Sequence, residues 1–389
     1  MYLPALLAGG LAYAADLPPP TPVTSEVPTE SHDELAELKA RIAALEAAQA
    51  KAEQDAFLRD AESLAGEAPL PSESGAPSLF PMNPGITAFA DIVGQVGVHD
   101  GAITPGSTMY VRSLELDIRA AVDPFAKAAV VLAFEQEAPP LDGSAPSEGF
   151  GAEPEEAYID LVALPWHLSG RVGKFKQPFG LMNRTHPHDL PWTDAPAALD
   201  LLAEEGYNDT GGTLSWVVPV GPVGITVTGG ALSGEPFEEA GPNAGLAGLG
   251  RVEVFGGFGS VDVGVGASAV HHFGLGAQAL GGDFSFRYRP STRRSVVVLA
   301  ELLRSMEGEL GGYAALQVQP GRSVYLGFRE DFDAAGPVKH NLFLSYYTSE
   351  FLRLRIGGGY DPAAQAVDAL AQLTFVWGSH PSEPWWVNK

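Results

Sequence analysis

The feature that most constrains this chain is a two-residue alternation of apolar and polar side chains, which recurs in short runs from Gly85 onward. In the run SLELDIRA, which starts at Ser113, the charged residues Glu115, Asp117 and Arg119 alternate with apolar ones. Successive side chains of a β-strand point to opposite faces of a sheet, so each run predicts a strand with one apolar and one polar face. Sixteen such runs begin near Gly85, Thr108, Phe125, Pro154, Leu168, Tyr207, Val223, Leu246, Ser260, Gly276, Arg294, Leu310, Arg322, Val338, Phe351 and Ala366.

The connections between these runs alternate in length. Tight turns are expected at Asp123-Pro124, Pro165-Trp166, Gly221-Pro222, Phe258-Gly259, Pro290-Ser291, Pro320-Gly321 and Ser349-Glu350, and longer segments such as 137–153, 177–206 and 233–245 lie between them. Outer-membrane barrels have short periplasmic turns and longer external loops. We therefore predict an all-β fold, a transmembrane antiparallel β-barrel of about 16 strands with both of its ends on the periplasmic side. A soluble sandwich, the alternative, also has strands with two unlike faces, but it has no reason to keep this rhythm.

The residues before the first run divide into four segments. Residues 1–15 combine a short apolar run with Ala12-Tyr13-Ala14, the small-x-small pattern that signal peptidase reads, and predict a secretory signal peptide. The Pro-, Thr-, Ser- and Glu-rich residues 16–31 predict a disordered spacer, and the Pro-, Ser- and Gly-rich residues 65–84 a linker. Between them, residues 32–64 predict a periplasmic α-helical coiled coil, whose seam is Leu35, Leu38, Ile42 and Leu45. An amphipathic helix that lies on its own protein is the alternative. The barrel is expected over 85–378 and a C-terminal tail over 379–389.

Charge and residue types exclude several functions. The 48 acidic and 23 basic residues give a net charge of −25, and nucleic acid is not an expected partner because binding phosphates needs clustered Lys and Arg. Cysteine is absent, which excludes disulfides and thiolate chemistry. No G-x-S-x-G motif or paired-carboxylate pattern marks a catalytic site, so we expect neither enzyme activity nor a cofactor.

The segment KFKQPFGLMNRTHPHDLPWTDAP, which starts at Lys174, lies at the third external connection. In general porins the third external loop folds into the lumen, and charges at the constriction set which ions pass. We expect 177–205 to fold inward, extended through the prolines and with a short helix around Ala197 to Glu205. A plug, in which ion pairs only hold the loop to the wall, is the alternative. The expected constriction residues are Arg171, Lys174, Lys176, Arg184, His186, His188, Asp189, Asp194, Glu204 and Glu205.

A metal site is an alternative interpretation of the same segment. His186 and His188 project to one side of an extended chain, and Asp189 offers an oxygen. No distant fourth ligand is evident, so we expect no metal here.

Four segments resemble the phosphate-selective porin O/P-like family of Gram-negative outer-membrane proteins. They are RVGKFKQPFGLMNRTHPHDLPWTDAP, EEGYNDTGGTLSWVVP, the strand onset NPGITAFADIVGQVG and the closing AQLTFVWGSHP, and the resemblance covers roughly Met82 to Pro381. It implies an N-terminal coiled coil, a sixteen-stranded barrel that is often trimeric, and passive diffusion of solutes. Arg171, Lys174, Lys176 and Arg184 are then candidate anion contacts.

The chain departs from this family in its charge. Phosphate-selective members resemble one another in basic pore ladders, whereas one hairpin here carries Glu135, Glu137, Asp142, Glu148, Glu153, Glu155 and Glu156. We expect the acidic segment near Glu148 to Glu156 to concentrate cations at the pore entrance, and ion selectivity to be mixed or mildly cation-favouring.

Together these features predict a porin in the bacterial outer membrane that passes small solutes or ions. Its partners would be outer-membrane lipids, those solutes, and further copies of itself, in a trimer. The alternative function is a structural anchor with a closed or plugged barrel, whose acidic periplasmic helix tethers the membrane to the cell wall or to a partner.

Overall fold

The computed structural model describes residues 84–136, 138–144, 151–203, 206–237, 245–378 and 384–387. All of them belong to one compact unit, Ala56–Lys389. The predicted signal peptide, spacer and coiled coil lie outside the described residues, as does the linker apart from Pro84. Glu137, Glu148 and the site residues Glu204 and Glu205 also lie outside them.

The described residues form strands and short 3-10 helices. The strands are β1 (Gly85–His99), β2 (Ala102–Ile103), β3 (Thr108–Asp123), β4 (Ala126–Glu135), β5 (Gly151–Leu164), β6 (Leu168–Lys176), β7 (Asn208–Val220), β8 (Val223–Leu232), β9 (Ala247–Phe258), β10 (Val261–His272), β11 (Ala277–Ser291), β12 (Arg294–Arg304), β13 (Leu310–Gly321), β14 (Val324–Asp333), β15 (Gly336–Tyr347), β16 (Leu352–Asp361) and β17 (Ala366–Gly378). The 3-10 helices are η1 (Pro165–His167), η2 (Pro187–Asp189), η3 (Ala197–Leu201) and η4 (Glu235–Phe237). Apart from the two-residue β2, sixteen strands remain, and each predicted onset lies within three residues of one of them.

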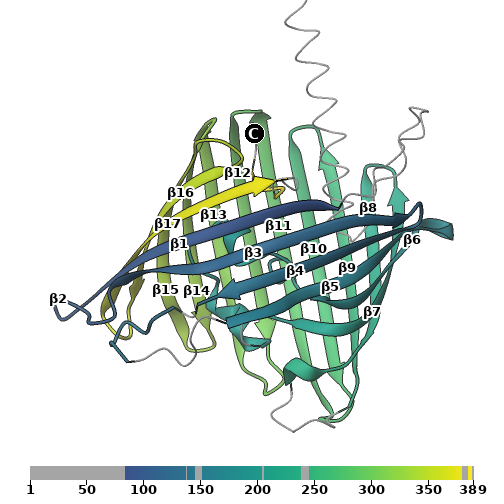
Figure 1. The fold of residues 1–389 in the computed structure, drawn as a ribbon, viewed down its shortest axis with the longest axis horizontal. Coiled ribbons are helices and arrows are strands. Elements are labelled where there is room, and N and C mark those ends of the chain that lie inside the picture. The colour runs from purple at the N-terminus through teal and green to yellow at the C-terminus, as the bar shows by residue number, and fades with distance from the viewer. Residues whose placement is uncertain are drawn as a thin grey trace, which may run out of the picture. The chain divides into compact units, whose positions relative to one another are not determined.

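These sixteen strands close into a barrel (Figure 1). Each pairs antiparallel with the strand that follows it, and the first pairs with the last. The closure is visible at Ala90 of β1, which faces Leu114 of β3 on one side and Phe375 of β17 on the other. Closure removes the free edges at which unpaired backbone groups would meet lipid.

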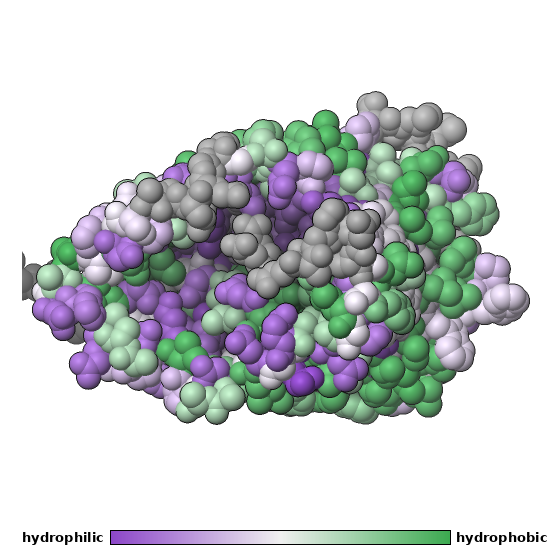
Figure 2. All heavy atoms as spheres, turned by 90° about the horizontal axis from the view of Figure 1, so that it is seen from below, coloured by the Kyte–Doolittle hydropathy of each residue, from purple (hydrophilic) through white to green (hydrophobic). Residues whose placement is uncertain are grey.

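On strands such as β3 and β16, polar side chains face the interior of the barrel and apolar ones face outward, whereas β8 to β15 also turn apolar side chains inward. On β16, Arg353 and Arg355 are buried, whereas Leu354 and Ile356, at the alternate positions, are exposed. Leu342 of β15 is 66% exposed. A soluble protein buries such residues, so an apolar outer face belongs to a barrel that lipid surrounds. Figure 2, a view onto one end of the barrel, shows hydrophilic residues gathered inside the outline and hydrophobic ones along much of its edge.

The predicted rhythm of the connections is strongest in the first half of the barrel. At the end that holds both termini of the strand region, β3 and β4, β7 and β8, and β9 and β10 are each joined by two residues. At the opposite end the chain takes 30 residues or more between β6 and β7, but only residues 334–335 between β14 and β15. At this end, the connections are therefore long in the first half of the barrel and short in the second half.

Two of the expected turns are displaced. Pro290-Ser291 and Pro320-Gly321 are the last residues of β11 and β13, and the turns follow at 292–293 and 322–323. The register shifts at both places, between Tyr288 and Ser291 and between Val318 and Gly321. A bulge leaves one residue out of the ladder, so a proline without an N–H can remain within the strand.

No helix in the described part of the chain is long and apolar enough to cross a membrane.

Candidate pore-lining site

The long connection between β6 and β7, residues 177–207 and called here the inner loop, is closed at its base by backbone and side-chain hydrogen bonds. Gln177 N–H donates to the carbonyl oxygen of Tyr207 at 2.9 Å. The amide of Asn183 joins both ends, because its Nδ2 donates to the carbonyls of Gln177 (2.8 Å) and Tyr207 (2.9 Å), while its Oδ1 accepts from Tyr207 N–H. The loop therefore leaves the wall and returns to it at one fixed neck.

The first turn of the inner loop is held by a carboxylate on β12. Glu301 accepts the backbone N–H groups of Leu181 and, at 3.2 Å, Met182, and it also accepts the hydroxyl of Tyr313 at 2.6 Å. Gly180 lies against the same carboxylate with φ of +66°, and a Cβ there would come within 2.2 Å of Glu301 Oε1. This position requires glycine for both its left-handed backbone and its close approach.

Three arginines on three strands hold the middle of the inner loop by consecutive backbone carbonyls. Arg355 of β16 donates to Trp192 O, Arg112 of β3 to Thr193 O at 2.6 Å, and Arg329 of β14 to Asp194 O at 2.8 Å. β14 and β16 lie on the side of the barrel across from β6 and β7, where the loop begins and ends, so these contacts carry the loop across the interior. Buried carbonyls require partners, and here each partner is a guanidinium.

One face of the inner loop packs on an apolar patch of the wall. Trp192 is nearly fully buried and meets the ring of Tyr313 edge-on, with centroids 5.2 Å apart. The apolar cluster joins Phe179, Leu181, Met182, Leu190, Trp192, Ala198, Leu199, Leu202 and Tyr207 of the loop to Leu232, Ala247, Leu249, Val270, Ala279, Val297, Leu299, Leu303, Tyr313, Ala315, Tyr325, Phe343 and Tyr347 of β8 to β15. The predicted short helix is present as η3, within this cluster.

The opposite face of the loop meets charged groups on β3 and β5. His186 Nδ1 lies 3.1 Å from Glu155 Oε2 and 3.4 Å from Glu115 Oε2, and His188 Nδ1 lies 2.9 Å from Glu115 Oε1. Although burial alone lowers the pKa of both imidazoles, the surrounding carboxylates raise the pKa of His186 well above its ordinary value and that of His188 to about 10. Both rings therefore favour the charged form at neutral pH.

The expected acidic entrance is wrong for its last two members. Glu155 and Glu156 are buried inside the barrel, where Glu155 Oε1 pairs with Lys176 Nζ at 2.9 Å and Glu156 accepts Lys176 N–H at 2.8 Å. The ladder between β4 and β5 skips Glu155, since Val131 faces Glu156 and Leu132 faces Pro154. This bulge lets two consecutive residues turn inward, which strict alternation does not allow. Glu153 is exposed, as expected.

The remaining predicted site residues divide between the wall and the loop. On the wall, Arg171 pairs with Asp160 at 2.6 Å and stacks over Tyr158, and Lys174 donates to the carbonyl of Pro154 at 3.2 Å. In the loop, Asp189 lies 3.4 Å from His188 and Asp194 lies 3.2 Å from Lys339 Nζ. The structure thus brings Lys176, His186, His188 and Asp189 together, and places Arg171 and Asp194 in separate pairs.

Arg184 differs from the other basic residues of the loop. Two of its guanidinium nitrogens, Nε and Nη2, are buried and have no hydrogen-bond partner among the described residues. Burial lowers the pKa of this guanidinium to about 10. It remains charged at neutral pH.

The sequence analysis missed two contributors to this interior. The first is the pair Arg112 and Arg329, which belong to runs interpreted only as strands. Their charge at inward positions is the signal that could have found them.

The second contributor is the C-terminal tail. Trp385, Trp386 and Val387 are buried in the same apolar cluster as the inner loop, and Gln317 Nε2 of β13 donates to Trp386 O at 3.1 Å.

Comparison with known proteins supports the fold. The structure is similar to a loop L8 deletion mutant of OmpT, an outer membrane protein of Vibrio cholerae, with a TM-score of 0.50 and 11% identity over 76% of this chain and 99% of that one. It is also similar to Salmonella typhi OmpF in complex with daunomycin, with a TM-score of 0.51 and 8% identity over 77% and 99% of the two chains. At such identities the likeness concerns the fold alone.

Sequence comparison adds little to this. No family model matches the chain. An uncharacterised protein of Aquifex aeolicus (strain VF5) is 27% identical over 142 residues, which are 36% of this chain and 27% of that protein. The fold and its apolar outer face define a porin-like, sixteen-stranded β-barrel of the bacterial outer membrane.

Proposed function

We propose that this protein is a porin, through which small solutes or ions diffuse passively, and that the inner loop narrows its lumen. The observation that carries the proposal is that the loop leaves the wall at β6 and is held by Arg329 of β14, the strand halfway around the barrel from β6, and by Arg112 of β3. A segment held in this way reduces the cross-section available to solutes. Charged side chains along it, among them the partly exposed Arg184 and His186, would then border the path.

Because the chain has no cysteine, a single introduced thiol can be modified without labelling any other residue. In a Thr185→Cys variant, the single thiol stands on a half-buried position of the loop, next to Arg184. Modification with a charged, water-soluble thiol reagent should reduce the single-channel conductance in planar bilayers. Leu342→Cys is the matched control, because that residue faces outward and its modification should leave conductance unchanged.

A deletion of 182–194 provides the complementary test. It should enlarge the conductance while the barrel keeps its heat-modifiable migration on a gel. A folded deletion variant with unaltered conductance would show that the loop does not limit the pore.

The alternative is a structural anchor with a closed barrel, and the C-terminal tail favours it. Trp385 and Trp386 bury indole rings in the interior, on the side of β11 and β13, with the Arg287 guanidinium 5.6 Å from the Trp385 ring. A tail and a loop in one lumen are what a plugged barrel requires. Reconstituted protein that inserts into planar bilayers without conducting would establish this function and exclude the porin.

Three finer features remain proposals. They are membership of the phosphate-selective O/P-like family, assembly as a trimer, and a periplasmic coiled coil. Chemical cross-linking of the full chain and of a chain lacking 32–64 would test the last two together.

A further inference from the structure

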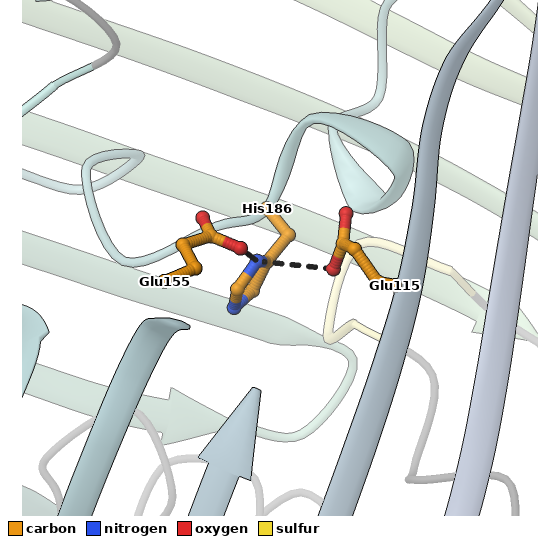
Figure 3. Close-up of side chains that lie close together, drawn as sticks. All are labelled: Glu115, Glu155 and His186. Atoms are coloured by element: carbon orange, nitrogen blue, oxygen red, sulfur yellow. Dashed lines mark ion pairs between the residues drawn. The ribbon is translucent and has the colours of Figure 1, made fainter. Parts of the chain in front are cut away.

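The three side chains Glu115, Glu155 and His186 converge inside the barrel (Figure 3). Glu115 comes from β3, Glu155 from β5, and His186 from the inner loop, and each offers one ligand atom within 4.8 Å of the other two. In Figure 3 the imidazole lies between the two carboxylates. We propose that these three residues bind a divalent transition-metal ion such as Zn²⁺, which fastens the loop to the wall.

The spacing of the ligand atoms fits such an ion. Metal–ligand bonds of 2.0–2.2 Å in tetrahedral geometry separate two ligand atoms by about 3.4 Å. His186 Nδ1 lies 3.1 Å from Glu155 Oε2 and 3.4 Å from Glu115 Oε2. Two edges of the ligand triangle therefore already have the required length.

Two of the three ligand atoms, Glu155 Oε2 and His186 Nδ1, are buried and have no hydrogen-bond partner among the described residues. They lie 3.1 Å from each other. The Glu155 residue is more than nine-tenths buried, at 8% exposure. Buried polar atoms almost always have partners, and an ion between these two would satisfy both.

The second polar atom of each ligand is occupied by a neighbour. Glu115 Oε1 is held by His188 at 2.9 Å, and Glu155 Oε1 by Lys176 at 2.9 Å. His186 Nε2 lies 3.4 Å from Glu156 Oε2. Metal-binding histidines usually direct their other ring N–H to a carboxylate, which orients the ring and leaves the opposite nitrogen to bind the ion. The neighbours thus fix one free atom on each ligand, aimed at the common point.

The ligand set decides the class of ion. An imidazole with two carboxylates suits Zn²⁺ and similar transition metals, whereas Mg²⁺ and Ca²⁺ prefer oxygen ligands alone. The +2 charge of a divalent ion balances the −2 charge of the two carboxylates. His186 is only partly buried, with 16% of its side chain exposed, so that a water or solute oxygen can complete the coordination. Here the ion would bridge a loop residue to the two wall strands β3 and β5.

The test uses the folded full-length protein in detergent, stripped with a chelator and titrated with Zn²⁺ by calorimetry, followed by metal analysis after gel filtration. One retained equivalent of Zn²⁺ is expected. Co²⁺ as a probe should give the visible absorption of a low-symmetry, four- or five-coordinate site. The variants His186→Ala and Glu115→Gln should lose that equivalent, and Glu156→Gln should weaken binding by about 10- to 100-fold because it releases the ring.

His340→Ala is the matched control. His340 Nδ1 lies 2.6 Å from Glu330 Oε2, so this pair has the same chemistry, but the described residues contain no third ligand beside it. This variant should retain the Zn²⁺ of the wild type. Heat-modifiable migration confirms that each variant is folded.

Two results would overturn the proposal. Failure of the wild-type protein to retain Zn²⁺ would mean that the imidazole carries only a proton. Retention that is equal in the wild type and in folded His186→Ala would mean an adventitious ion only. Neither result bears on whether the barrel conducts, because the measurement does not depend on channel activity.

Discussion

Arg329 Nη1 donates to the backbone carbonyl of Asp194 at 2.8 Å, while its Nη2 lies 3.3 Å from a carboxylate oxygen of the same residue. One fully buried guanidinium on β14 therefore holds both the main chain and the side chain of one loop residue. It also pairs with Asp331, two positions along its own strand, at 2.8 Å. This relation makes Arg329 the most connected attachment point of the inner loop.

Removal of this guanidinium should release the middle of the loop. Arg329→Ala leaves the carboxylates of Asp194 and Asp331 without their main cationic partner. Breaking a buried pair in this way typically costs about 3–5 kcal/mol. We expect faster proteolysis within 177–207 and larger current fluctuations in bilayers. Arg322→Ala, at an exposed turn, should match the wild type in both assays. A loop that stays protected in folded Arg329→Ala would contradict this role.

The attachment at Asp194 should depend on pH. Burial alone raises the pKa of Asp194, but Arg329 and Lys339 lower it below its ordinary value, and Asp331 and Asp368 are the acidic groups nearby. A carboxyl with a lowered pKa in the folded state stabilises that state above its unfolded pKa of about 3.9, and this contribution is lost as the pH falls through the folded value. Loop attachment should therefore be constant from neutral pH to about pH 4 and weaken in stronger acid.

The variant Asp194→Asn provides the check. At neutral pH its current fluctuations should exceed those of the wild type, and the difference should begin to shrink only below about pH 4, as the pH falls toward the lowered folded pKa of Asp194. A difference that instead shrinks between pH 7 and about pH 5, where the carboxylate is fully ionised, would show that another group controls the attachment.

The barrel was predictable from the sequence because the strand period and the alternation of polar and apolar side chains are local properties. Glu115 and Leu114 take opposite faces of β3 as alternation requires, and Arg353 and Arg355 take the inner face of β16. The inward course of the inner loop was expected from its place in the chain and its charge. Its attachments were not predictable, because many of them join residues distant in the chain, such as Arg112 and Thr193, which are 81 positions apart. A bulge, as at Glu155, also breaks the alternation without an evident sequence signal.

The C-terminal tail should limit conduction if the barrel is open. Trp385 and Trp386 pack in the interior, and replacing a buried Trp by Ala typically costs about 3–5 kcal/mol. The double variant Trp385→Ala/Trp386→Ala should show a higher single-channel conductance and lower thermal stability. Trp166→Ala is the matched control, since that indole is 81% exposed at a turn between β5 and β6, and both quantities should stay at wild-type values. Unchanged conductance in the double variant would place the tail beside the path of the ions.

Ion selectivity is expected to be mixed or mildly cation-favouring, because several basic groups of the interior are paired with carboxylates. Arg251 pairs with Asp283 at 2.6 Å, Arg171 with Asp160 and Lys176 with Glu155, so these cations present little net charge to a passing ion. Two guanidinium nitrogens of Arg184 have no hydrogen-bond partner in the described part of the chain, so this residue is a candidate to attract anions. The measurement is the reversal potential across a salt gradient, at low and at high salt. Attraction by exposed acidic groups such as Glu153 should fade at high salt, where the screening length falls to about 3 Å, whereas partly buried charges are screened less.

Arg184→Gln should shift the reversal potential toward cation selectivity at both salt concentrations, and Arg322→Gln, at the exposed turn, should not. Strong anion preference of the wild type at both concentrations would contradict the expected balance and support a phosphate-type pore, with Lys174→Gln as the next variant to measure.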